Sequence, residues 1–214
     1  MPLTTTSYAI LGLLDLRDWS AYELAQQAGR SLAFVWPVSE SQLYAEPKRL
    51  ATEGLISVRM ASSGPRRSRQ VLSITDAGRR ELRAWLATEP APPRIQMEAL
   101  LRTLLATSGT PADLVMSLDA TTAAVAADWD AGLELVRGYL AGDNPFPERL
   151  HANLVWMVLV HDLQLLLLDW AEYGRGRVAE WPGDGAAPDD VGLHALVERL
   201  ARADRQRIIP ARPG

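Results

Sequence analysis

Short polar side chains gather at the start of one amphipathic segment of the chain. Ser39 precedes the segment and Gln42 follows three residues later, a spacing typical of the capping box that begins a helix. Serine and glutamine at a helix N-terminus can hydrogen-bond to base edges in duplex DNA, and cations further along can hold phosphates. The candidate DNA contacts of this segment are Ser39, Ser41, Gln42, Tyr44, Lys48 and Arg49.

The same residues also have a purely structural interpretation, which the sequence leaves open. Ser39 and Gln42 can serve only to cap the helix. Glu40 and Glu46 lie in the same segment, and both would repel a phosphate.

A second group of candidate contacts follows a turn signal. Arg66, Arg67 and Arg69 come directly after Gly64-Pro65, between two segments of strand-like alternation at 55–61 and 70–75. An arginine run is often only a solvated surface. At the tip of a hairpin that follows a capped helix, it is better interpreted as a wing that grips the DNA backbone or minor groove.

The elements that must position these side chains can be read from hydrophobic spacing and caps. Helices are predicted over 5–16 and 21–28, the second with Ser20 and Glu23 as its capping box. A third follows Ser39 and stops at Gly54, a hairpin follows, and a fourth helix begins at Thr75 or Asp76 and runs to about residue 87. This order builds a winged helix-turn-helix.

Pro47 interrupts the third helix. Its missing N–H removes a hydrogen bond to Leu43, and its ring crowds that carbonyl group. We therefore predict either a kink or an early end of the helix near Glu46, which leaves the second half of the helix undetermined.

Clustered prolines mark the clearest boundary, at residues 89–93. We expect a winged helix-turn-helix domain over 1–88, a linker over 89–93 and a helical dimerisation domain over 94–209. The helices expected in the second domain are 94–107, 112–141, 148–173 and 191–207, with a loose connection over 174–190. The predicted fold class is mainly α with a small β-hairpin.

The helix over 148–173 contains an apolar run, residues 154–168, that invites a membrane interpretation. The run is shorter than a membrane span, and it carries His161, Asp162 and Gln164 near its middle. A helix that is apolar almost all round is more simply buried in a core or a subunit interface.

Charge is distributed unevenly along the 214 residues. The chain has a net charge of −4, but residues 1–88 carry 11 basic and 8 acidic residues, while the remainder carries 11 basic and 18 acidic residues. A basic first part and an acidic second part is expected when only the first contacts phosphate. The N-terminal residues lack a basic segment ahead of an apolar run, so a cytoplasmic protein is expected. The chain has no cysteine, which excludes disulfides, thiolate metal sites and a cysteine nucleophile.

Enzymatic chemistry has no support in the sequence. The three histidines are far apart without ligand partners at helical spacing, and no phosphate loop, nucleophile elbow or paired carboxylates are present. We therefore expect neither an enzyme, a metal site nor a cofactor. A site for a small aromatic effector is a separate hypothesis, and its candidate residues are Trp129, Trp156, His161 and Trp170.

The segments that make up the first domain resemble the PadR family of bacterial transcriptional regulators. The match rests on residues 8–14, 20–24, 41–44, 48–50, 53–56 and 73–79, within a span of 7–86. The resemblance implies a homodimer that binds a pseudo-palindromic operator in double-stranded DNA, most often as a repressor and usually with a small-molecule inducer. A winged helix that binds proteins in place of duplex DNA is the alternative.

Overall fold

The computed structural model describes residues 2–32, 35–62, 68–181, 193–194 and 196–197. The chain divides into two packing units, one made of Met1–Gln96 with Ala131–Gln164 and the other of Met97–Asp130 with Leu165–Gly214. The long helices α6 (Pro111–Leu140) and α7 (Leu150–Ala179) therefore each contribute to both units. The boundaries expected at 1–88, 89–93 and 94–209 stay predictions about which segments fold independently.

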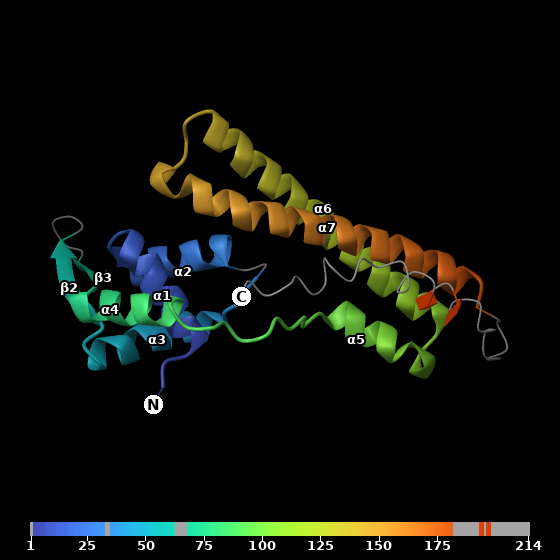
Figure 1. Cartoon of the computed structure of the whole chain (residues 1–214), viewed down its shortest axis with the longest axis horizontal. Coiled ribbons are helices and arrows are strands. Elements are labelled where there is room, and N and C mark those ends of the chain that lie inside the picture. Colours follow the sequence, from blue (N-terminus) through green and yellow to red (C-terminus); the bar gives the residue numbers. More distant parts are fainter. Residues whose placement is uncertain (1, 33–34, 63–67, 182–192, 195, 198–214) are drawn as a thin grey trace, which may run out of the picture. The chain divides into compact units, whose positions relative to one another are not determined.

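Three helices begin the first unit: α1 (Thr5–Leu16), α2 (Ala21–Ser31) and α3 (Glu40–Thr52) (Figure 1). Capping boxes fix where α2 and α3 start, because Ser20 accepts from the Glu23 N–H and Ser39 accepts from the Gln42 N–H, as the sequence predicted. Gly54 follows α3 with a φ of 72°, a conformation that glycine adopts without steric cost and that ends the helix.

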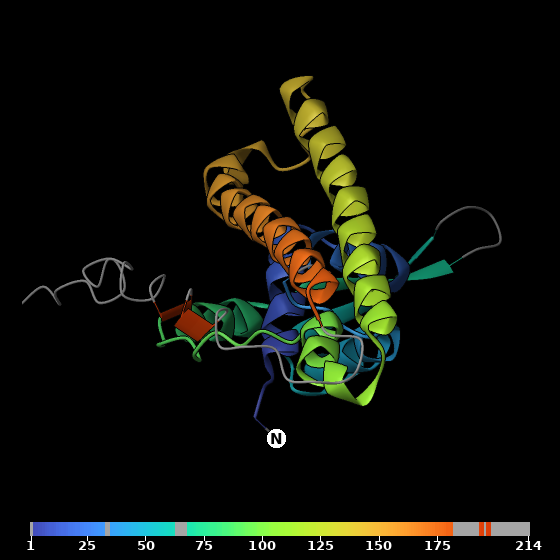
Figure 2. The same ribbon diagram turned by 90° about the vertical axis from the view of Figure 1, so that its right-hand side faces the viewer.

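An antiparallel sheet completes the winged helix. Strands β2 (Ile56–Ser62) and β3 (Ser68–Ile74) form the predicted hairpin, with Val58 opposite Leu72, and helix α4 (Asp76–Leu86) follows (Figures 1 and 2). A two-residue strand that the sequence did not suggest, β1 (Trp19–Ser20), pairs with the other edge of β3, so the strand order is β1-β3-β2.

One apolar core joins these helices and strands. Leu11, Leu24 and Leu50, from α1, α2 and α3, are completely buried in it. Trp19 is also buried, and its indole Nε1 donates to the Leu13 carbonyl oxygen over 2.7 Å, which satisfies the one polar atom of the ring. This core sets the position of α3.

Helix α3 does not end near Glu46, and that part of the prediction was wrong. It continues through Pro47 to Thr52. Pro47 is buried and lies between Leu43 and Leu50 on the inner face of the helix, at the spacing of one apolar stripe. Burial of the proline ring offsets the lost hydrogen bond, so both halves of α3 are available to a site.

The described part of the second unit is built mainly of helices. It contains α5 (Glu98–Leu104), the short helix η1 (Ala106–Ser108) and the adjoining parts of α6 and α7; a further short helix, η2 (Pro147–Arg149), precedes α7 in the first unit. Leu114 and Leu118 of α6 pack with Ala171 and Val178 of α7. The expected loose connection over 174–190 was wrong for its first residues, because α7 continues to Ala179, and residues 182–190 lie outside the described residues. The last expected helix, 191–207, falls mostly outside the described residues.

Helix α7 is exposed along much of its apolar surface. Together with the turn before it, Pro147–Ala179 is one helix of the described chain that is long and apolar enough to cross a membrane, which by itself is weak support for a span. Within residues 154–159, five large apolar side chains are at least 36% exposed: Leu154, Val155, Trp156, Val158 and Leu159.

Candidate nucleic-acid interface

Helix α3 has two opposite faces. Leu43, Pro47 and Leu50 are buried against the core, so the positions on the opposite face of the helix are turned toward solvent. The outward positions include Ser41, Tyr44 and Lys48, which are spaced three and four residues apart and therefore share a face. Tyr44 is 38% exposed despite its size. The outer face thus brings a hydroxyl group, a phenol and an ammonium group together.

The N-terminus of α3 is fully engaged in its own cap. The Ser39 hydroxyl accepts from the Gln42 N–H at 3.3 Å, and Gln42 Oε1 accepts from the Ser39 N–H at 3.3 Å. Ser39 Oγ also lies 3.0 Å from Ser41 Oγ. Because the carbonyl end of Gln42 serves the cap, its Nε2 amide group is the donor that can reach a base without breaking it. A bidentate contact with adenine would need the cap to open.

Arg49 points away from the outer face. Its Nη2 donates to Ser7 Oγ of α1 at 2.6 Å and also pairs with Glu46 Oε1, while its Nη1 donates to the Pro2 carbonyl oxygen at 3.2 Å. Ser7 is completely buried and donates its hydroxyl to Glu46. This network was not predicted from the sequence, although the three-residue spacing of Glu46 and Arg49 is a signal for an ion pair.

The pKa of Glu46 reflects two opposed effects. Burial of the carboxyl group raises its pKa, but hydrogen bonds from Arg49 and Ser7 and the guanidinium charge outweigh burial, and the pKa lies below its ordinary value of 4.5. The pKa of Arg49 is raised, chiefly by its hydrogen bond to Glu46.

This lowered pKa predicts a pH-dependent contribution to stability. A carboxyl group with a lower pKa in the folded state stabilises the fold above its unfolded pKa, and that contribution is lost as the pH falls through the folded pKa. We expect Glu46→Gln to be less stable than the wild type at pH 7 and to lose less stability than the wild type on acidification to pH 3. Urea unfolding at both pH values measures the difference; a gap that stayed constant would contradict the assignment.

The predicted wing is described only in part. Arg66 and Arg67 lie outside the described residues. Arg69 stands opposite Ala61 in the hairpin, and its Nη1 lies 3.3 Å from Glu23 Oε1 in α2. Glu23 is the partner of the N-cap residue Ser20 in the capping box of α2, and the pKa of Glu23 is lowered mainly by hydrogen bonds from Ser20. Arg69 is thus held beside the start of α2, with its side chain 52% exposed.

The four effector candidates do not belong to one unit. Trp156 and His161 lie on the part of α7 that belongs to the first unit, and Trp129 and Trp170 lie in the second. Trp170 is half-buried against the apolar cluster of α6 and α7. Neither unit by itself contains all four candidates, and the aromatic effector site stays a prediction.

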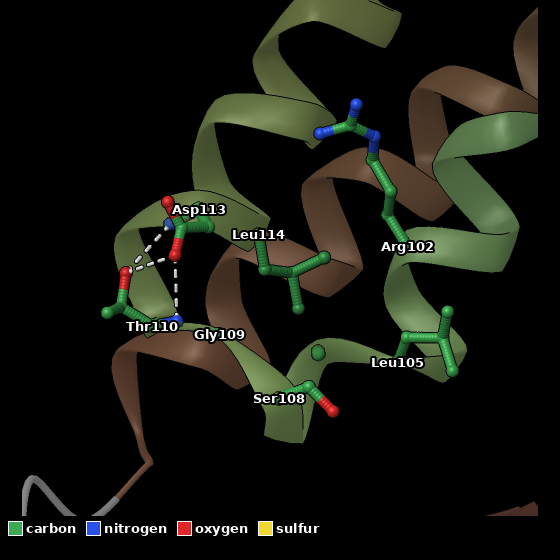
Figure 3. Close-up of a pocket in the computed structure, with 8 residues that line it drawn as sticks. Arg102, Leu105, Ser108, Gly109, Thr110, Asp113 and Leu114 are labelled. Atoms are coloured by element: carbon green, nitrogen blue, oxygen red, sulfur yellow. Dashed lines mark hydrogen bonds between the residues drawn. The ribbon is translucent and has the colours of Figure 1, made fainter.

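A shallow cavity of about 230 Å³ lies in the second unit, where α5 is followed by α6. Figure 3 shows Arg102 and Leu105 on the α5 side of the cavity and Leu114 on the α6 side. Thr110 and Asp113 close their own capping box at its edge, with Thr110 Oγ1 donating to Asp113 Oδ2 at 2.7 Å. None of the effector candidates lines this cavity. Within the described part of the chain, no three His, Cys, Asp or Glu side chains gather as metal ligands would.

The first unit contains a winged helix-turn-helix. Its helices α1, α2 and α3 pack with a small antiparallel sheet, and α3 is capped and has a polar outer face. The model of the Transcriptional regulator PadR-like family matches residues 10–84. These residues are therefore similar to the PadR-like family of transcriptional regulators.

Individual relatives agree with this placement. The negative transcriptional regulator PadR of Bacillus subtilis is 34% identical over 96 residues, which cover 44% of this chain and 53% of that protein. The chain thus aligns with only about half the length of the curated relatives it matches.

Solved structures of the Bacillus subtilis protein share the fold over more of the chain. The crystal structure of PadR in complex with operator DNA is 22% identical, with a TM-score of 0.67 over 82% of this chain and 99% of that chain. The complex with p-coumaric acid is also 22% identical, with a TM-score of 0.60 over 83% of this chain and 100% of that chain. At this identity the likeness concerns the fold.

Proposed function

We propose that this protein is a transcriptional regulator that binds a pseudo-palindromic operator in double-stranded DNA as a homodimer. The observation that carries the proposal is the outer face of α3, where Ser41, Tyr44 and Lys48 face solvent opposite the buried stripe of the helix. Ser39 and Gln42 lie at the end of α3 that enters the major groove in helix-turn-helix proteins. The two copies of α3 in a dimer would lie about one DNA turn, ~34 Å, apart.

The match of residues 10–84 to the PadR-like family supports this proposal, and so does the likeness in fold to a PadR bound to operator DNA. The similarity to the negative transcriptional regulator of Bacillus subtilis favours a repressor. We place the protein in the cytoplasm, where its DNA target would be, and assign it no enzymatic reaction.

The salt dependence of binding tests the DNA contacts. Each cation that neutralises a phosphate adds about 0.9 to the slope of log affinity against log salt concentration. We expect Lys48→Ala to lower that slope by about 1 and Arg66→Ala with Arg67→Ala to lower it by about 2. Fluorescence anisotropy with a labelled duplex, selected from a random pool by the wild-type protein, measures the slope between 50 and 300 mM salt (roughly the range in which counterion release dominates).

Arg137 provides the matched control, because it is exposed on α6 and pairs with Glu134 over 2.7 Å. Arg137→Ala should leave the slope unchanged. A wild-type protein that shows no salt-dependent binding to duplex DNA would contradict the proposal and favour the alternative, a winged helix that binds proteins in place of duplex DNA.

Homodimer formation is proposed from the exposed apolar face of α7. Side chains such as Val155, at 75% exposure, and Leu159, at 57%, are seldom left in water next to one another. Asp162 and His161 on the same helix favour a protein interface over a membrane.

A small aromatic effector is proposed as the signal that releases the operator. The support is the p-coumaric acid complex of the related PadR, together with four candidate side chains in this chain: Trp129, Trp156, His161 and Trp170. Quenching of tryptophan fluorescence by a series of phenolic acids, with the same acids weakening operator binding, would support the effector. Unchanged fluorescence across the series would contradict it.

A further inference from the structure

The contact between α1 and α3 is polar at one point, and that point is Ser7. Ser7 is the third residue of α1, and its side chain closes the capping box of that helix by accepting from the Thr4 N–H at 2.8 Å. The same hydroxyl donates to Glu46 and accepts from Arg49 Nη2 at 2.6 Å. A group that is fixed by the cap of α1 is therefore also bonded to two residues of α3.

Arg49 uses each of its three guanidine nitrogens within the fold. Nε donates to Glu46 Oε1 at 3.1 Å, and Nη2 donates to Ser7 and Glu46. Nη1 donates to the Pro2 carbonyl oxygen and lies 3.7 Å from Glu53 Oε1. The side chain of Arg49 is 26% exposed, and that of Glu46 is 16% exposed. A guanidinium group bonded in this way would have to leave the buried Ser7 hydroxyl and the half-buried Glu46 carboxylate to reach a phosphate, and leaving that carboxylate without its ion pair is costly.

The position of these two residues on α3 explains what the bonds control. Glu46 and Arg49 lie between the buried stripe and the outer face that carries Tyr44 and Lys48. Apolar packing alone tolerates small rotations and sliding of a helix, whereas hydrogen bonds to a fixed hydroxyl do not. Rotation of α3 about its axis would move its outer face relative to the major groove of the DNA.

We infer that Ser7, Glu46 and Arg49 form a positioning cluster that fixes the rotation of α3 for base reading, and that Arg49 is a positioning residue and not a phosphate contact. The inference rests on the proposed DNA binding. It replaces the role that the sequence predicted for Arg49. The lowered pKa of Glu46 agrees with it, because a charged carboxylate keeps the guanidinium group in place at neutral pH.

Arg49→Gln separates the two roles of the residue. Affinity is measured by fluorescence anisotropy at several salt concentrations for two duplexes: the one that the wild type selects from a random pool, and an unselected random-sequence duplex. For a positioning residue we expect the salt slope to stay unchanged and the ratio of selected to random affinity to fall about tenfold, the size of one lost base contact. A slope lowered by about 1 with an unchanged ratio is the signature of a phosphate contact and would overturn the inference.

Glu46→Gln, unlike Arg49→Gln, should change the salt slope. It releases Arg49 from its ion pair, so binding to the random duplex should strengthen and its salt slope should steepen by about 1. The double variant, Glu46→Gln with Arg49→Gln, should return the slope to that of the wild type. Arg49→Lys should restore part of the lost ratio, since lysine can pair with Glu46 but lacks the second nitrogen that reaches Ser7.

Thermal unfolding measures the temperature at which each variant unfolds. The affinities are compared at a temperature at which all variants are folded. If Arg49→Gln does not fold, Ser7→Ala replaces it, because that variant removes no charge and should lower the ratio without moving the slope. A wild type that binds neither duplex would remove the proposed function and the inference with it. If the wild type binds DNA with a salt-dependent affinity and Arg49→Gln lowers the salt slope by about 1, the proposed function stands and only the inference is overturned.

Discussion

Replacing Gly78 by alanine is expected to destabilise the winged helix by about 3 kcal/mol, the upper end of the usual cost of overpacking. Gly78 lies in the first turn of α4, and a Cβ atom there would stand 2.2 Å from the Leu55 carbonyl oxygen and 2.8 Å from Ile74 Cγ1. The Leu55 oxygen cannot move aside easily, because it accepts hydrogen bonds from the N–H and the hydroxyl of Thr75, each at 3.0 Å.

Gly12→Ala is the matched control for this variant. Gly12 lies inside α1, and a Cβ atom there would meet nothing within 4 Å. Because alanine favours a helix over glycine, this change should stabilise the protein by about 0.5–1 kcal/mol. Guanidinium unfolding of both variants measures the two signs; a Gly78→Ala protein as stable as the wild type would show that α4 can shift away from the sheet.

Local signals in the sequence were sufficient for most of the winged helix. The caps at Ser20, Ser39 and Thr75, the stop at Gly54 and the alternation of the hairpin each act over a few residues, and each appears in the structure. The same holds for the outer face of α3, since its spacing follows from the buried stripe.

The features that could not be predicted depend on contacts between distant residues. Helix α3 continues through Pro47 because the ring is buried in the core, and β1 exists because Trp19 pairs with Leu72 of β3. Helix α7 continues through Gly174 because that glycine lets it approach α6, where a Cβ atom would lie 2.9 Å from Leu118 Cδ1. At Pro47 and Gly174 a residue that usually ends or weakens a helix is retained for its packing.

The inward direction of Arg49 is a further example of this limit. From the sequence, an arginine on a recognition helix resembles a phosphate contact. Its true partner, Ser7, lies 42 positions away on another helix. Only the fold shows that the buried hydroxyl and the guanidinium group meet, and so the set of outward-facing candidates on α3 is smaller than the sequence indicated.

Introducing two negative charges on α7 is expected to abolish tight operator binding without touching the winged helix. Val155 and Leu159 lie one turn apart on the exposed apolar face of α7. Val155→Glu with Leu159→Glu would bury two unpaired carboxylates in the proposed dimer interface, and the dimer is expected to dissociate because burial of unpaired charges is strongly unfavourable. A monomer contacts one half-site at a time, so loss of the second half-site should weaken operator binding by 10²–10⁴-fold, roughly the gain that linking two binding modules provides.

The measurements are sedimentation velocity for the oligomeric state and fluorescence anisotropy for operator affinity. Ala123→Glu with Ala127→Glu is the matched control, because it adds the same charges at the same spacing to exposed positions of α6. The control should remain dimeric and bind the operator normally. A Val155→Glu, Leu159→Glu protein that stays dimeric would place the interface elsewhere, and a wild type that floats with lipid vesicles would mean that the apolar face of α7 is covered by lipid and not by a second copy of the chain.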